Sequence, residues 1–154
     1  MTAAFYGSDV QALKCELAAE VLRSFGTLRM QVTGWSMLPA IWPGDTLMIE
    51  SAPVGDVTEG DIVLFGRERR LFVHRVVKKI GGSKFVTRGD AMSALDPVIG
   101  HHELLGRVSS IQRNGRCIAP RPRRSVAERA IAGLVRNSQI AARILVGVGG
   151  MHQI

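Results

Sequence analysis

The sequence predicts a mainly β fold with one helix at each end, and three observations support this prediction. Short segments with a β pattern follow one another from about residue 28 to residue 119, and turn residues separate them. No helical pattern lies between these segments, which favours an antiparallel sheet over a parallel α/β arrangement. Periodic apolar residues before and after this region predict two amphipathic helices.

The first predicted helix covers about residues 8–26. Ser8 or Asp9 supplies an N-terminal cap, and Gly26 is typical of a helix end. A stripe of four apolar residues is expected to pack against the helix's own domain: Val10, Leu13, Leu17 and Val21.

Seven β segments follow the first helix. Turn signals such as Pro43-Gly44-Asp45 and Gly81-Gly82-Ser83 separate them. The predicted strands are 28–33, 46–50, 61–65, 71–78, 84–88 and 104–113, with a short stub at 116–119.

A second helix is predicted over about residues 125–146. Ser125 and Glu128 have the spacing of a capping box. Arg129, Arg136 and Arg143 recur every seven residues and therefore share one face. The opposite face is apolar and consists of Ala127, Ile131, Leu134, Ala141 and Leu145. The chain is thus divided into an N-terminal helical segment, 1–27, a β domain, 28–119, and an Arg-rich linker with a helix, 120–154.

The length and composition of the chain limit the classes of protein to which it can belong. The chain has 154 residues, of which 46% are hydrophobic and 21% charged, so it can build a core and is not wholly disordered. No apolar run approaches the ~20 residues of a membrane span. The first residues have no secretory pattern, and Cys15 and Cys117 have no metal or redox spacing. A location in the cytoplasm or peripheral on the membrane is expected.

The net charge of +7 is unevenly distributed. Residues 1–112 hold 12 basic and 12 acidic residues, whereas residues 113–154 hold eight Arg and one Glu. The basic C-terminal helix therefore has three interpretations: a solvated helix packed on the domain, a nucleic-acid contact, or a helix at an anionic membrane surface. Each basic residue near an anionic leaflet contributes about 1 kcal/mol, so reversible membrane association is physically reasonable.

The first candidate catalytic residue is Ser36, in the segment Gly34-Trp35-Ser36-Met37-Leu38-Pro39. A serine hydroxyl needs a base within hydrogen-bond reach, and an imidazole with an ordinary pKa of about 6.5 suits that task. His74, in Val73-His74-Arg75-Val76, is the candidate base, and a carboxylate on its other ring nitrogen would fix the tautomer. Hydrolysis is then expected to rise through about pH 6 to 7.

Four blocks of sequence in this order resemble the type I signal peptidases and the self-cleaving repressors of the SOS response. They are the Ser36 segment, Gly60-Asp61-Ile62-Val63, the His74 segment, and Val86-Thr87-Arg88-Gly89-Asp90. The resemblance implies the fold of that clan, with Ser36 as nucleophile. The base position, a Lys in most bacterial members, is held here by His74, which resembles the endoplasmic-reticulum and archaeal branch.

In that branch, acids of the last block support the histidine, and they map onto Asp90 and Asp96. The residues leave both candidates open, with a slight preference for Asp90 as the direct partner of His74. The resemblance further implies an extended substrate bound as an added strand and cut after small residues. Substrate contacts are expected from the residues around the nucleophile: Gly34, Trp35, Met37, Leu38 and Pro39.

A serine peptidase of this kind needs no cofactor, and no metal is expected. The neighbouring His101 and His102 point to opposite faces of a strand and are interpreted as surface residues. Gly34 stands two residues before Ser36, where many signal peptidases have a hydroxyl residue, so backbone amides must form most of an oxyanion hole.

Two further hypotheses belong to other classes. The first is a module of the same fold that binds an extended peptide without cutting it. The second is a regulator that binds nucleic acid through the Arg-rich tail. Nucleic acid is the less supported partner, because the ~26 residues before the β region are too few for the helix-turn-helix module of the repressors.

Overall fold

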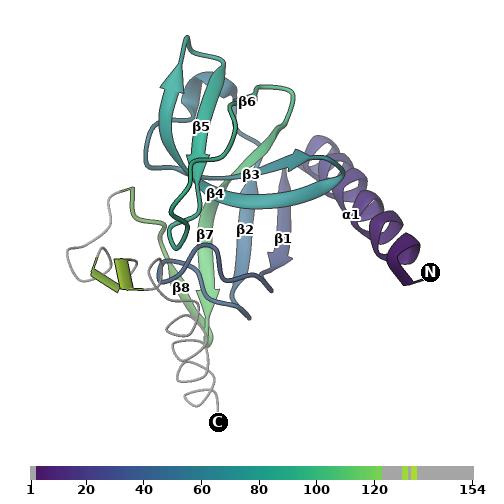
Figure 1. The fold of residues 1–154 in the computed structure, drawn as a ribbon, viewed down its shortest axis with the longest axis horizontal. Coiled ribbons are helices and arrows are strands. Elements are labelled where there is room, and N and C mark those ends of the chain that lie inside the picture. The colour runs from purple at the N-terminus through teal and green to yellow at the C-terminus, as the bar shows by residue number, and fades with distance from the viewer. Residues whose placement is uncertain (1–2, 123–129, 132, 135–154) are drawn as a thin grey trace.

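The computed structural model describes residues 3–122, 130–131 and 133–134, and it confirms a mainly β fold with an N-terminal helix (Figure 1). The helix α1 is Ala3–Phe25. The strands of the described chain are β1 (Thr27–Gln31), β2 (Thr46–Glu50), β3 (Ile62–Arg67), β4 (Arg70–Ile80), β5 (Lys84–Arg88), β6 (Ile99–Gly100), β7 (Leu104–Arg113) and β8 (Arg116–Ile118). A short 3₁₀ turn, η1 (Val54–Asp56), follows β2.

All eight strands of the described chain join one antiparallel sheet. Their order is β1-β2-β7-β3-β4-β5-β6, and β8 pairs with the far end of β7. The predicted bounds of β2, β5 and β7 are confirmed. Those of β1, β3 and β4 differ by one or two residues at both ends, and β8 ends one residue earlier than predicted. The two-residue strand β6 was not predicted, because it is too short to carry an alternating pattern.

The strand β3 lies between two hydrophobic cores. Its residues Ile62 to Phe65 are all buried, which fits a strand covered on both faces. Ile62 and Leu64 join a core with Leu47, Ile49, Val108 and Ile111, whereas Val63 and Phe65 join a second core with Val57, Val76, Phe85 and Ile99. Neighbouring strand residues point to opposite faces, so β3 contributes side chains to both cores and connects them.

The face of α1 that packs on the sheet differs from the predicted one. Of the predicted stripe, Val10, Leu13 and Leu17 are about half exposed and Val21 is half-buried. The buried residues between Gln11 and Phe25 are Ala12, Ala18 and Leu22. The helix begins at Ala3, before the predicted cap. A Cβ built at Gly66 of β3 would lie 2.8 Å from Cys15 Sγ, so the helix approaches the sheet closely through small residues.

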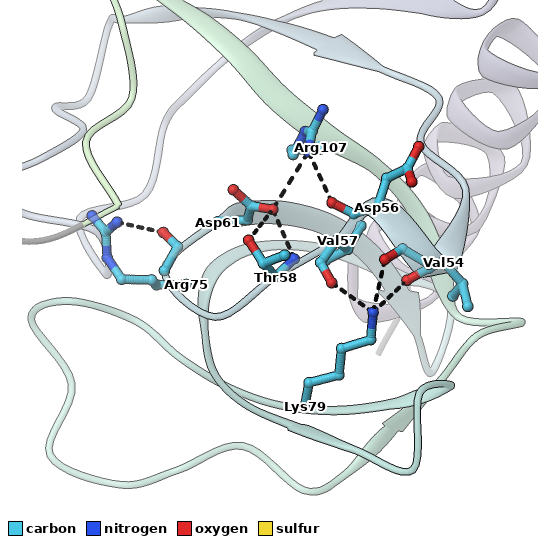
Figure 2. Close-up of polar contacts among 10 residues, drawn as sticks. Val54, Asp56, Val57, Thr58, Asp61, Arg75, Lys79 and Arg107 are labelled. Carbon is cyan, nitrogen blue, oxygen red and sulfur yellow. Dashed lines mark hydrogen bonds and ion pairs between the residues drawn. The ribbon is translucent and has the colours of Figure 1, made fainter.

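The segment between β2 and β3 is tied to β4 and β7 by polar contacts, which Figure 2 shows. Lys79 Nζ donates to the carbonyls of Val54, Gly55 and Val57 at 2.8–3.1 Å. Asp61 accepts hydrogen bonds from Thr58 and lies 3.5 Å from the Arg107 guanidinium. These contacts fix the segment that leads into the central strand.

The predicted helix over 125–146 lies almost entirely outside the described residues, and so do Arg129, Arg136 and Arg143. Of this region, residues 130–131 and 133–134 are described and helical, and Ile131 packs against the buried cluster of Leu38 and Ala91. A search of the described residues finds no helix with the length and apolar character needed to cross a membrane.

Candidate active site

Ser36 lies in the loop that connects β1 to β2. Across the base of this loop the Val32 amide donates to the Asp45 carbonyl at 2.9 Å, and the Gly44 amide donates to the Val32 carbonyl at 2.7 Å. The buried Asp45 carboxylate accepts hydrogen bonds from the Trp42 amide and from Nε and Nη2 of Arg113 on β7, at 2.6–2.9 Å. The sequence Trp42-Pro43-Gly44-Asp45 therefore closes the loop, and the Asp45–Arg113 pair anchors it to the sheet.

His74 lies in the middle of β4, opposite Val63 of β3. Its side chain is 9% exposed, and the rings of Phe65 and Phe72 lie at 6.0 Å from the imidazole. The Nε2 atom of His74 is 3.2 Å from Ser36 Oγ. A packed strand thus holds the imidazole beside the serine hydroxyl, although 38 residues separate the two in the sequence.

Asp96 approaches His74 from the other side. Its Oδ2 atom lies 2.6 Å from His74 Nδ1 and accepts a 2.7 Å hydrogen bond from Thr87 Oγ1. Burial acts to raise the pKa of the Asp96 carboxyl, but the hydrogen bonds from His74 and Thr87, with the charges of His74 and Arg67, lower that pKa below its ordinary value. Asp96 is therefore an ionised carboxylate at neutral pH.

The tautomer of a neutral imidazole at this position follows from the charge of Asp96. An ionised carboxylate can only accept hydrogen bonds, so His74 Nδ1 must be the donor to Asp96. In a neutral ring the other nitrogen, Nε2, then has a free lone pair, and it faces Ser36 Oγ. The three side chains have the connectivity that lets an imidazole take a proton from a serine hydroxyl.

Asp90 is not the residue that contacts His74 Nδ1, although the sequence slightly favoured it for that role. Both of its carboxylate oxygens accept hydrogen bonds from the Arg75 guanidinium, at 2.8 and 2.9 Å, and both side chains are buried. Arg75 also donates to the carbonyls of Gly60 and Arg121, at 2.8 and 2.6 Å. The direct partner of His74 is Asp96, and the preference for Asp90 was wrong.

The Asp90 segment nevertheless contacts the nucleophile through its backbone. The Ala91 amide donates to the Ser36 carbonyl at 2.8 Å. A Cβ built at Gly89 would lie 2.6 Å from that carbonyl oxygen and 3.1 Å from Ser36 Cβ. Gly89 therefore allows two segments of backbone to approach closely beside Ser36.

The residues predicted to contact substrate separate into two groups. Met37 and Leu38 are buried at 3% and 0% exposure, so they support the loop from inside rather than line an open surface. Trp35 and Gly34 are exposed, and Pro39 is half-buried, with its carbonyl accepting the Trp42 indole N–H at 2.9 Å. The φ of Gly34 is outside the left-handed region and a Cβ there would meet no atom within 4 Å, so neither the backbone conformation nor the space at this position requires a glycine.

Three residues of the site were not predicted from the sequence: Thr87, Arg75 and Arg67. Arg67 donates to the carbonyls of Pro97 and Val98, directly after Asp96, and pairs with Glu103 at 2.7 Å. A signal for Thr87 does exist, because it shares the inward face of β5 with Phe85 and is a polar residue at a core position. Polar residues at core positions need a hydrogen-bond partner, and here that partner is Asp96.

His101 and His102 are exposed, with their rings 5.8 Å apart. Among the described residues, no group of three or more His, Cys, Asp or Glu side chains is placed to hold a metal ion.

Comparison with protein families gives one match. Residues 6–108 match the family described as Peptidase S24-like, and this range contains Ser36, His74, Thr87, Asp90 and Asp96. Searches of curated protein sequences and of solved structures found no match.

Proposed function

The chain belongs to the Peptidase S24-like family of serine peptidases, and from this premise we propose that it is an endopeptidase of the signal-peptidase type with a Ser–His–Asp mechanism. One observation carries the proposal: the His74 imidazole bridges Ser36 Oγ and Asp96 Oδ2 through its two nitrogens. Because the proposed base is a histidine, we assign the chain to the Ser–His branch of the signal peptidases rather than to the Ser–Lys members.

Ser36 acts as the nucleophile. Its Oγ attacks the carbonyl carbon of the scissile peptide bond, and the hydroxyl proton moves to His74 Nε2. His74 then gives this proton to the leaving amine, the C–N bond breaks, and an acyl-serine remains. A water molecule, deprotonated by the same imidazole, hydrolyses the acyl-serine and restores Ser36.

Asp96 and the backbone around Ser36 stabilise the charges that form. The ionised Asp96 carboxylate faces the imidazolium that appears when His74 holds the proton. No side-chain hydroxyl stands at Gly34, so backbone amides beside Ser36 are the proposed donors to the oxyanion. Removing one such donor typically costs about 10²–10³-fold in turnover.

The proposed substrate is an extended precursor or leader peptide that is cut after small residues. An extended peptide satisfies its backbone groups as an added strand beside the site. The exposed Trp35, next to Ser36, is proposed to contact the peptide, whereas the buried Met37 and Leu38 are not. The chain is proposed to work in the cytoplasm or at an anionic membrane surface, with the Arg-rich C-terminal residues as the contact.

The test uses the purified full chain, its Ser36→Ala variant and a Ser109→Ala control on β7. All three are incubated with a diverse peptide library, with and without anionic vesicles, and the products are identified by mass spectrometry. Cleavage after small residues by wild type and Ser109→Ala, but not by Ser36→Ala, supports the proposal. Binding without cleavage by all three supports the alternative of a catalytically silent peptide-binding module. Higher activity with vesicles supports the membrane contact.

A further inference from the structure

Thr87 has a hydroxyl group in the interior of the protein. The residue lies on β5, opposite Val76 of β4, and its exposure is 0%. A buried hydroxyl without a partner costs about 1–3 kcal/mol, so its contact is informative. Thr87 Oγ1 donates to Asp96 Oδ2 at 2.7 Å.

Thr87 and His74 bind the same oxygen atom of Asp96. The Nδ1 atom of His74 lies 2.6 Å from Oδ2, and the Thr87 hydroxyl approaches that atom from β5. The Asp96 amide also donates to the Thr87 carbonyl at 2.9 Å. Thr87 therefore fixes Asp96 at two points, through the backbone and through the carboxylate, independently of the imidazole.

The surroundings of Asp96 show why such a second anchor matters. Asp96 lies in the connection between β5 and β6, and its side chain is 25% exposed. A partly exposed carboxylate on a loop can rotate about two side-chain torsions and exchange its partner for water. The Thr87 hydroxyl belongs to a buried residue of a strand, so its position is fixed and its hydrogen bond orients Oδ2.

We propose that Thr87 is a positioning residue for the reaction: its hydroxyl holds Asp96 Oδ2 against His74 Nδ1, and it thereby keeps the Nε2 lone pair directed at Ser36. The proposal rests on the proposed peptidase function. It distinguishes Thr87 from a residue that only fills the core, because valine fills the same volume without a donor.

The test compares Thr87→Val and Thr87→Ser with wild type and with Thr46→Val, a threonine of β2 outside the site. The quantities measured are kcat and KM on a peptide that wild type cleaves, and the proton resonance of His74 Nδ1–H at low field. We expect Thr87→Val to lower kcat about tenfold, in line with the loss of one hydrogen bond to a charged group, with KM within about twofold of wild type. Thr87→Ser, which keeps the donor, and Thr46→Val should both stay close to wild type.

The His74 resonance separates positioning from packing. In Thr87→Val it should move or broaden, and in Thr87→Ser it should remain. A wild-type kcat together with an unchanged resonance in a folded Thr87→Val overturns the inference while leaving the peptidase function standing. A folded wild-type protein that cleaves no peptide overturns both. Should Thr87→Val not fold, Thr87→Ala takes its place, and equal kcat values for Thr87→Ala and Thr87→Ser count against the proposal.

Discussion

Arg75 and Asp90 form a two-point ion pair, at 2.8 and 2.9 Å, in which both side chains are buried. Arg75 follows His74 on β4, and neighbouring strand residues point to opposite faces. The two acids of the fourth sequence block therefore serve two faces of one strand. Asp96 meets His74 on one face, and Asp90 meets Arg75 on the other.

This division predicts different outcomes for the two acids. Asp90→Ala leaves the Arg75 guanidinium charged and buried without its carboxylate, which typically costs about 3–5 kcal/mol of folding stability. Asp96→Asn should cost less folding stability than Asp90→Ala, because the amide keeps an oxygen acceptor at a partly exposed site. It should lower kcat about 10²–10⁴-fold, because the imidazole loses its ionised partner. Urea unfolding and peptide hydrolysis on both variants check this. Equal loss of stability in the two variants would contradict the assignment.

A substitution at Gly89 tests whether catalysis depends on the close contact between this residue and the Ser36 backbone. In Gly89→Ala, the new Cβ would lie 2.6 Å from the Ser36 carbonyl oxygen, so the Ser36 backbone must shift. A misplacement of about 1 Å can cost about 10²-fold in rate, and we expect kcat to fall by roughly that factor. Gly55→Ala is the matched control, because a Cβ at Gly55 meets no atom within 4 Å. Unchanged hydrolysis by a folded Gly89→Ala would show that the Ser36 backbone does not depend on this contact.

The pKa of Glu103 predicts how stability depends on pH. The hydrogen bond from Arg67 holds the pKa of this carboxyl below its ordinary value of 4.5, against the opposing effect of burial. A lowered pKa in the folded state adds stability that is complete above the unfolded value and is lost as the pH falls through the folded value. The stability of wild type should therefore exceed that of Glu103→Gln by a constant amount above about pH 5, and the difference should shrink below about pH 4.

Thermal unfolding of both proteins across this range checks the prediction. Arg67 also binds the carbonyls of Pro97 and Val98, so the Asp96 connection should loosen in the same acidic range. A difference between the two proteins that stays constant down to about pH 3 would show that the Arg67–Glu103 pair contributes nothing through its charge.

The sequence was sufficient to predict the Ser36–His74 pair and, in the described chain, every strand except β6. Strands such as β2 and β7 could be read from their own residues, because their alternating buried positions are local. The choice between Asp90 and Asp96 could not be made in this way, since both are acids in turn segments. Arg75 decides it by neutralising Asp90, and that contact depends on the pairing of β4 with β5.

The orientation of α1 could not be predicted from the local sequence either, because it depends on contacts with the sheet. The helix has apolar residues on two faces, and the larger ones, Val10, Leu13 and Leu17, favoured the wrong face. The close approach of Cys15 to Gly66 brings the face with small residues inward and places Leu22 in the core. Leu22→Ala should therefore cost about 2–5 kcal/mol of unfolding free energy, and Leu17→Ala no more than about 0.5 kcal/mol. Urea unfolding of the two variants measures the difference, and equal costs would mean that the helix packs through the face predicted from the sequence.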